Sequence, residues 1–230
     1  MVKRLAVLAG FLAVIAVAAQ LLLPAAVSDF AGDAVASLTH ARTAQARIET
    51  VPAVRMALGR FDRIWAEAQG AQFNKLAFDT LELDMADVQL DMKKLLLERK
   101  FALQSAKDIT LRAVVSEETL ASLINRSVKG VKNAEVRIAP EKVSVKAQLA
   151  FGNFLQAAVR VDGTLRASEG QIVFVTEEVV LDYKGLGNFG ASVFTDLALT
   201  KLDALPFGVS VKDVVLEDGR AVLYANNRER

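Results

Sequence analysis

The stretch LAFDTLELDMADVQL, residues 76–90, alternates apolar and polar side chains with a period of two, which predicts a β-strand with one buried face. Its apolar residues fall into three sets, and the first residue of each set follows the last residue of the previous set by three positions instead of two. The sets are Leu76 and Phe78; Leu81, Leu83 and Met85; and Val88 and Leu90. Such a jump exchanges the two faces of a strand unless the backbone takes in an extra residue, so we expect β-bulges or tight bends and a sheet that curves.

The segments before residue 76 predict another strand, preceded by short helices. Alternation at residues 64–68 indicates the strand. Pro52 and Gly59 enclose a short apolar segment, and these residues are typical of the start and end of a helix. Residues 28–40 suggest a short amphipathic helix.

The segments after residue 90 predict one well-marked helix and several further strands. Ser116 opens this helix, Glu117 and Glu118 in its first turn offset the helix dipole, and Gly130 ends it. Strands are expected at 136–138, 143–151, 155–161, 172–183, 209–216 and 221–224, and another helix at about 191–202. Asp218-Gly219 between the last two strands is a type I′ hairpin signal. The order of elements indicates an antiparallel α+β fold instead of alternating β-α-β units.

The composition excludes several classes of protein. The chain has 28 Lys and Arg against 27 Asp and Glu, and this balance gives no electrostatic footprint for a nucleic-acid partner. It contains no cysteine, which excludes disulfides, thiolate zinc sites, iron–sulfur clusters and a cysteine nucleophile. We expect no metal and no cofactor.

The N-terminus predicts a membrane anchor. An uncharged run at residues 5–23 follows Lys3 and Arg4 and ends at Pro24, and as a helix it is long enough to cross a bilayer core of roughly 30 Å. The positive flank predicts that the N-terminus stays in the cytoplasm and that the body is exported. A signal peptide cleaved after Ala18 is the alternative. We divide the chain into a signal anchor at 1–24, a membrane-proximal helical leader at 25–50, a single domain at 51–226 and a tail at 227–230.

Four segments, in this order, carry a family resemblance. They are VPAVRMALGRFDRI at 51–64, the alternating block at 76–90 with Asp91 after it, the helix at 116–125, and LPFGV at 205–209 followed by Asp218-Gly219. Together they resemble the LmeA-like phospholipid-binding family of bacterial envelope proteins. The resemblance runs from the anchor to the last hairpin.

The resemblance implies a TULIP-like fold, in which a long, curved antiparallel β-sheet wraps around amphipathic helices and leaves an apolar groove. It also implies phospholipid and the cell membrane as partners, a place in the bacterial envelope, and no known enzyme activity. The family has no catalytic motif, so it supplies no catalytic residue to this chain.

On such a fold, the groove would be lined by residues on the apolar faces of their elements. These residues are Leu81, Leu83, Met85, Leu120, Leu123, Ile124, Val159, Phe174, Phe194 and Leu197. A second predicted surface consists of Lys93, Lys94, Arg99 and Lys100 around three leucines, a mixture suited to an anionic membrane surface. An ordinary amphipathic connection is the alternative for that segment.

Other motifs have simpler explanations than chemistry. GLGNFG at 185–190 has the G-x-G-x-x-G form of a dinucleotide site, but the strand before it carries charges that a buried parallel strand lacks. His40, the only imidazole, has no triad pattern around it. The acidic residues of 79–91 alternate with apolar ones and lack calcium-loop spacing, so a solvated strand face is favoured. Trp65 is either covered by a helix containing Phe30 or an interfacial anchor.

Three functions follow in order of preference. The first is a non-enzymatic lipid-binding protein that holds acyl chains in the groove. The second is an envelope scaffold whose groove is a fully packed core and which acts through protein partners. The third is an enzyme, which requires a serine such as Ser144 within reach of a basic partner inside a pocket.

Overall fold

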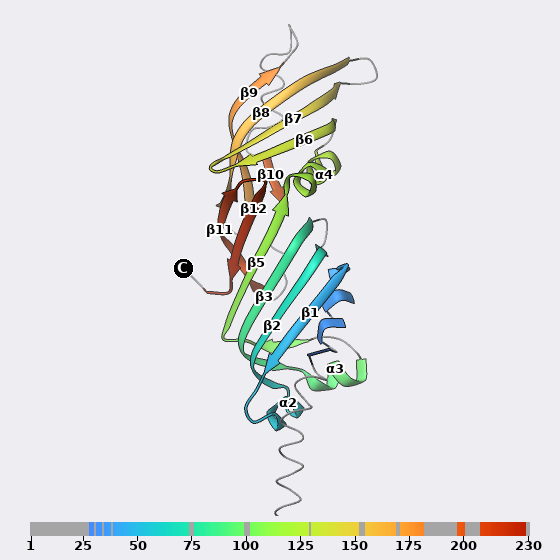
Figure 1. Ribbon diagram of the computed structural model, residues 1–230, viewed down its shortest axis with the longest axis vertical. Helices are drawn as coiled ribbons and strands as arrows, with labels where there is room; N and C mark the ends of the chain where they lie inside the picture. The colour runs from blue at the N-terminus through green and yellow to red at the C-terminus, as the bar shows by residue number, and fades with distance from the viewer. Residues whose placement is uncertain are drawn as a thin grey trace, which may run out of the picture. The chain divides into compact units, whose positions relative to one another are not determined.

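The computed structural model describes most of the chain after residue 27. The described residues are 28–29, 31–33, 35–37, 39–73, 76–98, 102–128, 130–151, 155–168, 171–181, 197–200 and 208–228. Helical residues occur within 28–39, before the first strand. The elements that follow are β1 (Thr43–Glu49), α2 (Val54–Ala57), β2 (Arg60–Phe73), β3 (Leu76–Leu90), α3 (Met92–Glu98), β4 (Leu103–Ser105), β5 (Asp108–Ser116), α4 (Glu117–Ser127), β6 (Val131–Ala139), β7 (Lys142–Phe151), β8 (Leu155–Ser168), β9 (Gln171–Leu181), β10 (Leu197–Thr200), β11 (Ser210–Glu217) and β12 (Arg220–Asn226) (Figure 1).

The strands form two sheets. The order in the first is β1-β2-β3-β5-β12-β11, with β4 paired to β3, and the order in the second is β10-β9-β8-β7-β6. The second sheet is therefore a meander of chain neighbours. Its strand pairs are antiparallel, as are β3–β4, β5–β12 and β11–β12 in the first sheet. The predicted class, α+β dominated by antiparallel sheet, is confirmed.

The chain folds into two compact units. The first contains residues 1–68 and 82–109, and the second contains residues 69–81 and 110–230. In the first unit the described core includes Phe61, Ile64, Leu83, Met85, Val88 and Leu90. In the second unit it includes Phe78, Leu111, Leu120, Ile138, Val143, Val161 and Val222.

The phase jumps predicted for residues 76–90 occur within the single strand β3. Phe78 and Leu81 are both buried although three positions separate them, and the same holds for Met85 and Val88. At the second jump, Asp87 has a φ of 48°, in the left-handed region that favours glycine. This local turn returns the apolar side chains to the buried face, as expected for a bulge.

The helix predicted to begin at Ser116 is confirmed as α4. The Ser116 side chain caps it by accepting a hydrogen bond from Thr119 N at 3.3 Å. The hairpin predicted at Asp218-Gly219 is also present, because Glu217 pairs with Arg220. Its turn is not type I′, since only Gly219 has a positive φ, 76°, and type I′ requires it at both central residues.

Two segments differ from their predicted helices. Residues 197–200, placed in a helix at about 191–202, form β10, and Leu197 pairs with Phe174 of β9. The edge of β9 supplies hydrogen-bond partners that override the helical pattern. Residues 43–49, placed in the helical leader, form β1, where the small residues Ala44 and Ala46 gave only a weak alternation signal.

The predicted anchor at residues 5–23 lies outside the described residues. Among the residues that are described, no helix is long and apolar enough to cross a membrane.

Candidate functional site

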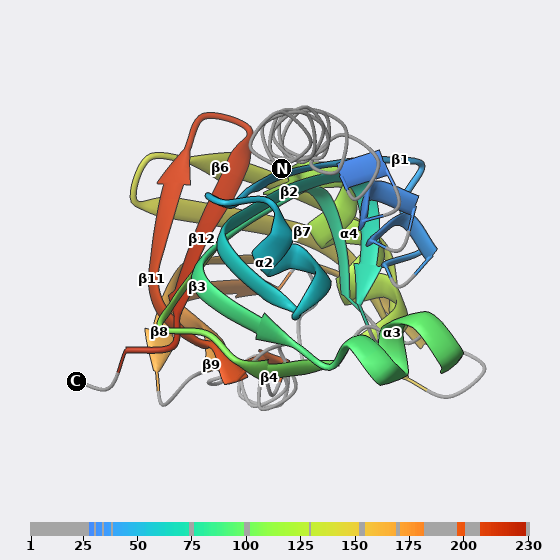
Figure 2. The ribbon, with the colours of Figure 1, turned by 90° about the horizontal axis from the view of Figure 1, so that it is seen from below.

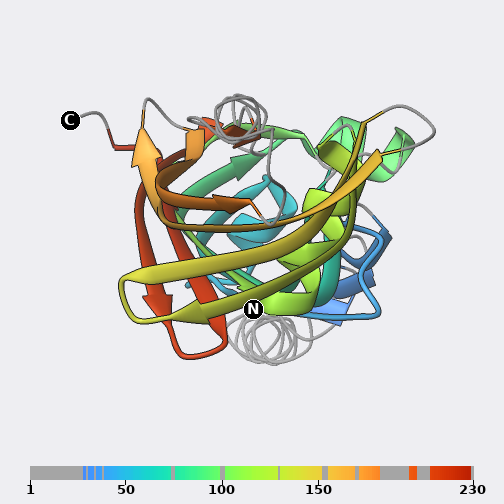
Figure 3. The same cartoon turned by 90° about the horizontal axis from the view of Figure 1, so that it is seen from above.

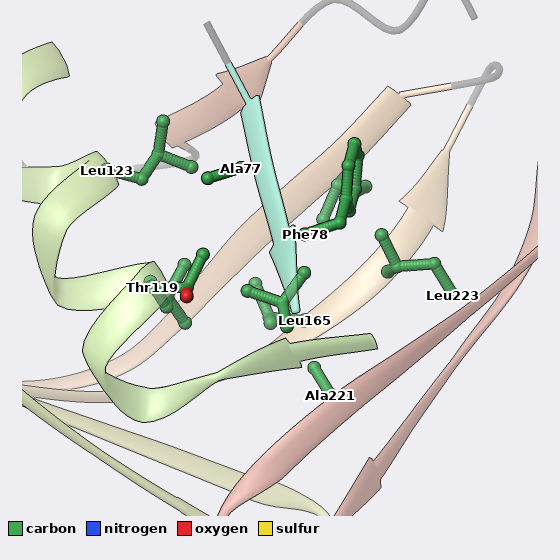
Figure 4. Close-up of a pocket in the computed structure, with 10 residues that line it drawn as sticks. Ala77, Phe78, Thr119, Leu123, Leu165, Ala221 and Leu223 are labelled. Carbon is green, nitrogen blue, oxygen red and sulfur yellow. The ribbon is translucent and has the colours of Figure 1, made fainter. Parts of the chain in front are cut away.

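The second unit contains an apolar pocket. Its volume is about 30 Å³, and α4 and strands of both sheets line it. The lining residues are Ala77 and Phe78 (β3), Val115 (β5), Thr119, Leu120 and Leu123 (α4), Leu165 (β8), Ile172 (β9), and Ala221 and Leu223 (β12). Figure 4 shows Thr119 and Leu123 on α4, with Phe78 and Leu223 across the pocket from them.

An aspartate from a distant part of the chain holds the start of α4. Asp79 of β3 accepts a hydrogen bond from Ser116 N at 2.6 Å through Oδ2. Its Oδ1 accepts a second from the Thr119 hydroxyl at 3.2 Å. A carboxylate at this end also interacts favourably with the helix dipole. Asp79 therefore positions the wall of the pocket that α4 provides.

Two further side chains tie α4 to β6, beside which it lies (Figures 1 and 3). Glu117 Oε1 accepts a hydrogen bond from Ile138 N at 2.8 Å. About two turns later in the helix, Asn125 Oδ1 accepts one from Ala134 N at 2.9 Å. The helix is thus fixed at both ends, and its apolar face is aimed at the pocket.

The pocket is suited to hydrocarbon. Thr119 is the only lining residue with a polar side-chain atom, and its hydroxyl already donates to Asp79. An apolar group placed here would leave no polar partner unsatisfied. The volume of about 30 Å³ is close to the share of one water molecule in the liquid, so an acyl chain enters only if the lining side chains move apart.

The structure brings two of the predicted groove residues together in this pocket, Leu120 and Leu123 of α4. Six others are buried but do not line it: Leu81, Leu83, Met85, Ile124, Val159 and Phe174. Leu83 and Met85 belong to the first unit, whereas all the residues that line the α4 pocket belong to the second. Leu197 is in β10, and Phe194 lies outside the described residues.

Sequence reasoning missed most of the pocket. Phe78 and Ile172 carried a signal, because both stood in apolar sets of predicted strands. Ala77, Ala221 and Thr119 carried none, since small or polar residues do not mark a buried face. Only the pairing of β12 with β5 and the placement of α4 bring these residues to one site.

Strands β8 and β9 approach each other closely at Gly163, beside Phe174. Gly163 of β8 lies at a register shift in the β8–β9 pair. A Cβ added to Gly163 would be 2.3 Å from Val175 O and 2.8 Å from Phe174 Cζ. The absence of a side chain at residue 163 therefore makes room for the buried Phe174 ring.

Ser144 lies across the β7–β8 strand pair from a buried carboxylate. Its cross-strand neighbour is Asp162, whose Oδ2 forms an ion pair with Lys142 Nζ at 3.0 Å. Burial alone would raise the pKa of Asp162, but hydrogen bonds from Ser144 and Lys142 and the charge of Arg160 outweigh it and lower the pKa. Asp162 Oδ1 has no hydrogen-bond partner within the described part of the chain. Ser144 does not line the pocket, so the arrangement required for the enzyme hypothesis is not formed there.

The acidic residues of β3 and its end have structural partners. Asp84 forms a two-bond ion pair with Arg63, and Asp91 accepts from the backbone N–H groups of Lys93 and Lys94, each at 3.1 Å. Across the described ranges, no group of three or more acidic or histidine side chains is arranged to hold a metal ion. The GLGNFG motif at 185–190 lies outside these ranges.

The predicted membrane-surface residues fall in and after α3. Lys93 and Lys94 are exposed, whereas Arg99 and Lys100 lie outside the described residues. Trp65 is half-buried and lines an open hollow of about 280 Å³ with Gln45, Arg47, Glu49 and Arg63. Phe30, its predicted cover, is also outside the described residues.

Comparison with known proteins identifies the family of the chain. A family model described as LmeA-like phospholipid-binding covers residues 18–226. No curated protein and no solved structure shows a significant match to the chain.

Proposed function

Because the chain belongs to the LmeA-like phospholipid-binding family, we propose that it is a non-enzymatic lipid-binding protein of the bacterial cell envelope. In this proposal, the α4 pocket takes part of an acyl chain. The observation that supports it is a cavity with apolar walls at the inner face of a well-anchored amphipathic helix. Each methylene buried there contributes about 0.8 kcal/mol, so binding needs no catalytic group.

The acyl chain requires more room than the pocket now has. Leu120 and Leu123 lie on the only helix among the lining elements, so a change in their rotamers widens the pocket without breaking a sheet. The predicted groove residues Leu81, Ile124 and Phe174, which belong to the same unit as the pocket, extend the proposed lipid path within the second unit.

The proposed cellular setting rests on the N-terminal sequence. Residues 1–24 act as a signal anchor in the cell membrane, with Lys3 and Arg4 in the cytoplasm and the body outside it. Such a protein transports, presents or senses phospholipid at the membrane. Cleavage of the segment would instead release the body.

The alternative is an envelope scaffold without a lipid cargo. The small volume of the pocket favours it, because a core that is already packed leaves no space for a ligand. The two functions differ in one measurable property, which is whether lipid remains bound to the purified chain.

Native mass spectrometry of the full chain, released from detergent, tests the proposal. The variant A77L adds bulk at the pocket, and the matched control A86L adds the same bulk to another half-buried alanine of β3 that does not line it. We expect bound phospholipid on the wild type and on A86L, and its loss from A77L. A wild-type chain free of lipid, or equal lipid on both variants, would refute the α4 pocket as the binding site.

A further inference from the structure

The most exposed large apolar side chains in the described part of the protein cluster around α2. Val51 is 72% exposed, Val54 is 62% exposed and Leu58 is 68% exposed. The next, Val180, is 45% exposed. Isolated apolar residues on a surface are ordinary, but a cluster of this kind marks an interaction site. We refer to Val51, Val54 and Leu58 as the α2 tip.

Two of these residues lie at the start and at the end of the short helix, and the third precedes it. Val54 opens α2 and Leu58 caps its C-terminus four positions later, a spacing that places both on one side of the helix, while Val51 lies in the turn that leads into it. Ala53 and Met56, on the alternate positions, are buried and supply the contact with the core of the first unit. Core packing therefore accounts for one side of α2 and leaves the exposed side unexplained.

The α2 tip is presented on an ordered turn. Val51 N donates to Asp62 Oδ2 at 2.8 Å, and Arg55 donates to Asp62 Oδ1 at 2.6 Å and to Val51 O at 3.3 Å. At the other end of the turn, Leu90 N donates to Gly59 O at 2.8 Å. These bonds hold the backbone that carries the apolar side chains, so little backbone entropy is lost when the side chains bind.

Basic residues lie beside the α2 tip. A Cβ on Gly59 would be 2.9 Å from Met92 Cγ at the start of α3, so α2 and α3 are neighbours within the first unit (Figures 1 and 2). The next two residues of α3, Lys93 and Lys94, are exposed, and so is Arg60 at the end of the α2 turn. Apolar side chains bordered by lysine and arginine complement a bilayer surface of anionic lipid.

We propose that the α2 tip inserts into the surface of an anionic phospholipid bilayer, with Lys93 and Lys94 at the headgroups. This inference rests on the proposed function, because a lipid-binding protein draws its ligand from a membrane. It adds a membrane-docking element that is separate from the α4 pocket.

The absence of cysteine allows a direct test on the full chain. The variants V54C and L58C place a single polarity-sensitive fluorophore on the α2 tip. The controls V180C and V215C place it at two other exposed valines, both in the second unit. Each labelled protein is reconstituted into vesicles of phosphatidylcholine with phosphatidylglycerol, with and without a quencher attached to the lipid acyl chain.

We expect the emission of the two tip labels to shift to the blue and to be quenched from the lipid, whereas the control labels do neither. Adding K93Q and K94Q should lower the ratio of docked to undocked protein on these vesicles roughly 30-fold, and leave it unchanged on phosphatidylcholine alone. Equal behaviour of tip and control labels, whether both shift or neither does, would overturn the insertion. An unchanged ratio in K93Q/K94Q would overturn the role of the lysines.

The same samples separate this inference from the proposed function. Native mass spectrometry reports the lipid bound to each labelled protein. If lipid is retained while the tip labels stay in water, the docking element is wrong and the lipid-binding proposal stands. If the tip labels enter the bilayer while no lipid is retained, the lipid-binding proposal is wrong and the docking element stands.

Discussion

Substitution of Gly163 by alanine tests the close approach of β8 and β9. The added Cβ would lie 2.3 Å from Val175 O, and real Cβ atoms essentially never come within 3.0 Å of another heavy atom. The carbonyl would therefore have to move by at least 0.7 Å, the difference between these two distances. The second obstacle is the ring of Phe174, which is only 4% exposed and has little room to turn.

Overpacking of this kind costs about 1–3 kcal/mol of unfolding free energy. The loss of freedom in the unfolded chain offsets about 0.4–1 kcal/mol of that cost. For a protein of this size, each kcal/mol corresponds to a shift of roughly 2–4 °C in Tm. We expect G163A to lower Tm by several degrees, with destabilisation centred on the second sheet.

The matched control is G32A. A Cβ on Gly32 would have its nearest neighbours at 3.6 Å, an ordinary contact distance, and Gly32 is helical. Alanine in a helix interior is more stable than glycine by about 1 kcal/mol, so G32A should unfold at the same temperature as the wild type or slightly higher. Thermal unfolding followed by circular dichroism, together with urea unfolding, measures both variants. If G163A unfolds at the same temperature and urea concentration as G32A, the reasoning about the close approach of β8 and β9 is refuted.

Three further predictions concern other parts of the second unit. D79A removes the acceptor for Ser116 N and the Thr119 hydroxyl. We expect the unfolding free energy measured in urea to fall by about 1–3 kcal/mol and the amide hydrogens of α4 to exchange faster. Unchanged exchange in α4 would contradict the capping role of Asp79. The folded pKa of Asp162 is lowered below 3.8, so its carboxylate contributes stability that is present above the unfolded pKa and is lost as pH falls through the folded pKa. The gap in unfolding free energy between the wild type and D162N should therefore be constant near neutral pH and shrink below about pH 4, and a gap that widens on acidification would contradict the ion-pair account. In G219A the added Cβ meets no atom within 4 Å, but the alanine must adopt a φ of 76°. We therefore expect the backbone alone to lower the unfolding free energy by about 1–3 kcal/mol. An unchanged unfolding free energy in urea would show that the hairpin turn rearranges.

Local patterns were sufficient to predict the elements whose signals come from near neighbours. The capping of α4 by Ser116 involves residues three positions apart, and the hairpin at Asp218-Gly219 closes within two residues. The phase jumps in β3 were visible as well, because burial of apolar side chains follows the sequence period directly. The same patterns, in order along the chain, carried the resemblance to the family that covers residues 18–226.

The tertiary structure decided the features that depend on distant partners. Whether residues 197–200 form a helix or a strand depended on the free edge of β9, and the register placed Leu197 opposite Phe174. The pocket depended on Asp79, which lies 37 residues before Ser116 in the chain. By its hydrogen bond with Ser116 N, Asp79 positions α4. The exposed α2 tip was equally hidden from the sequence, because an apolar residue reads as core until the surrounding elements show that nothing covers it. Spacing along the chain reports which side chains share a face, whereas the three-dimensional pairing of faces determines which of them meet, and that pairing is a sum of many weak long-range contacts.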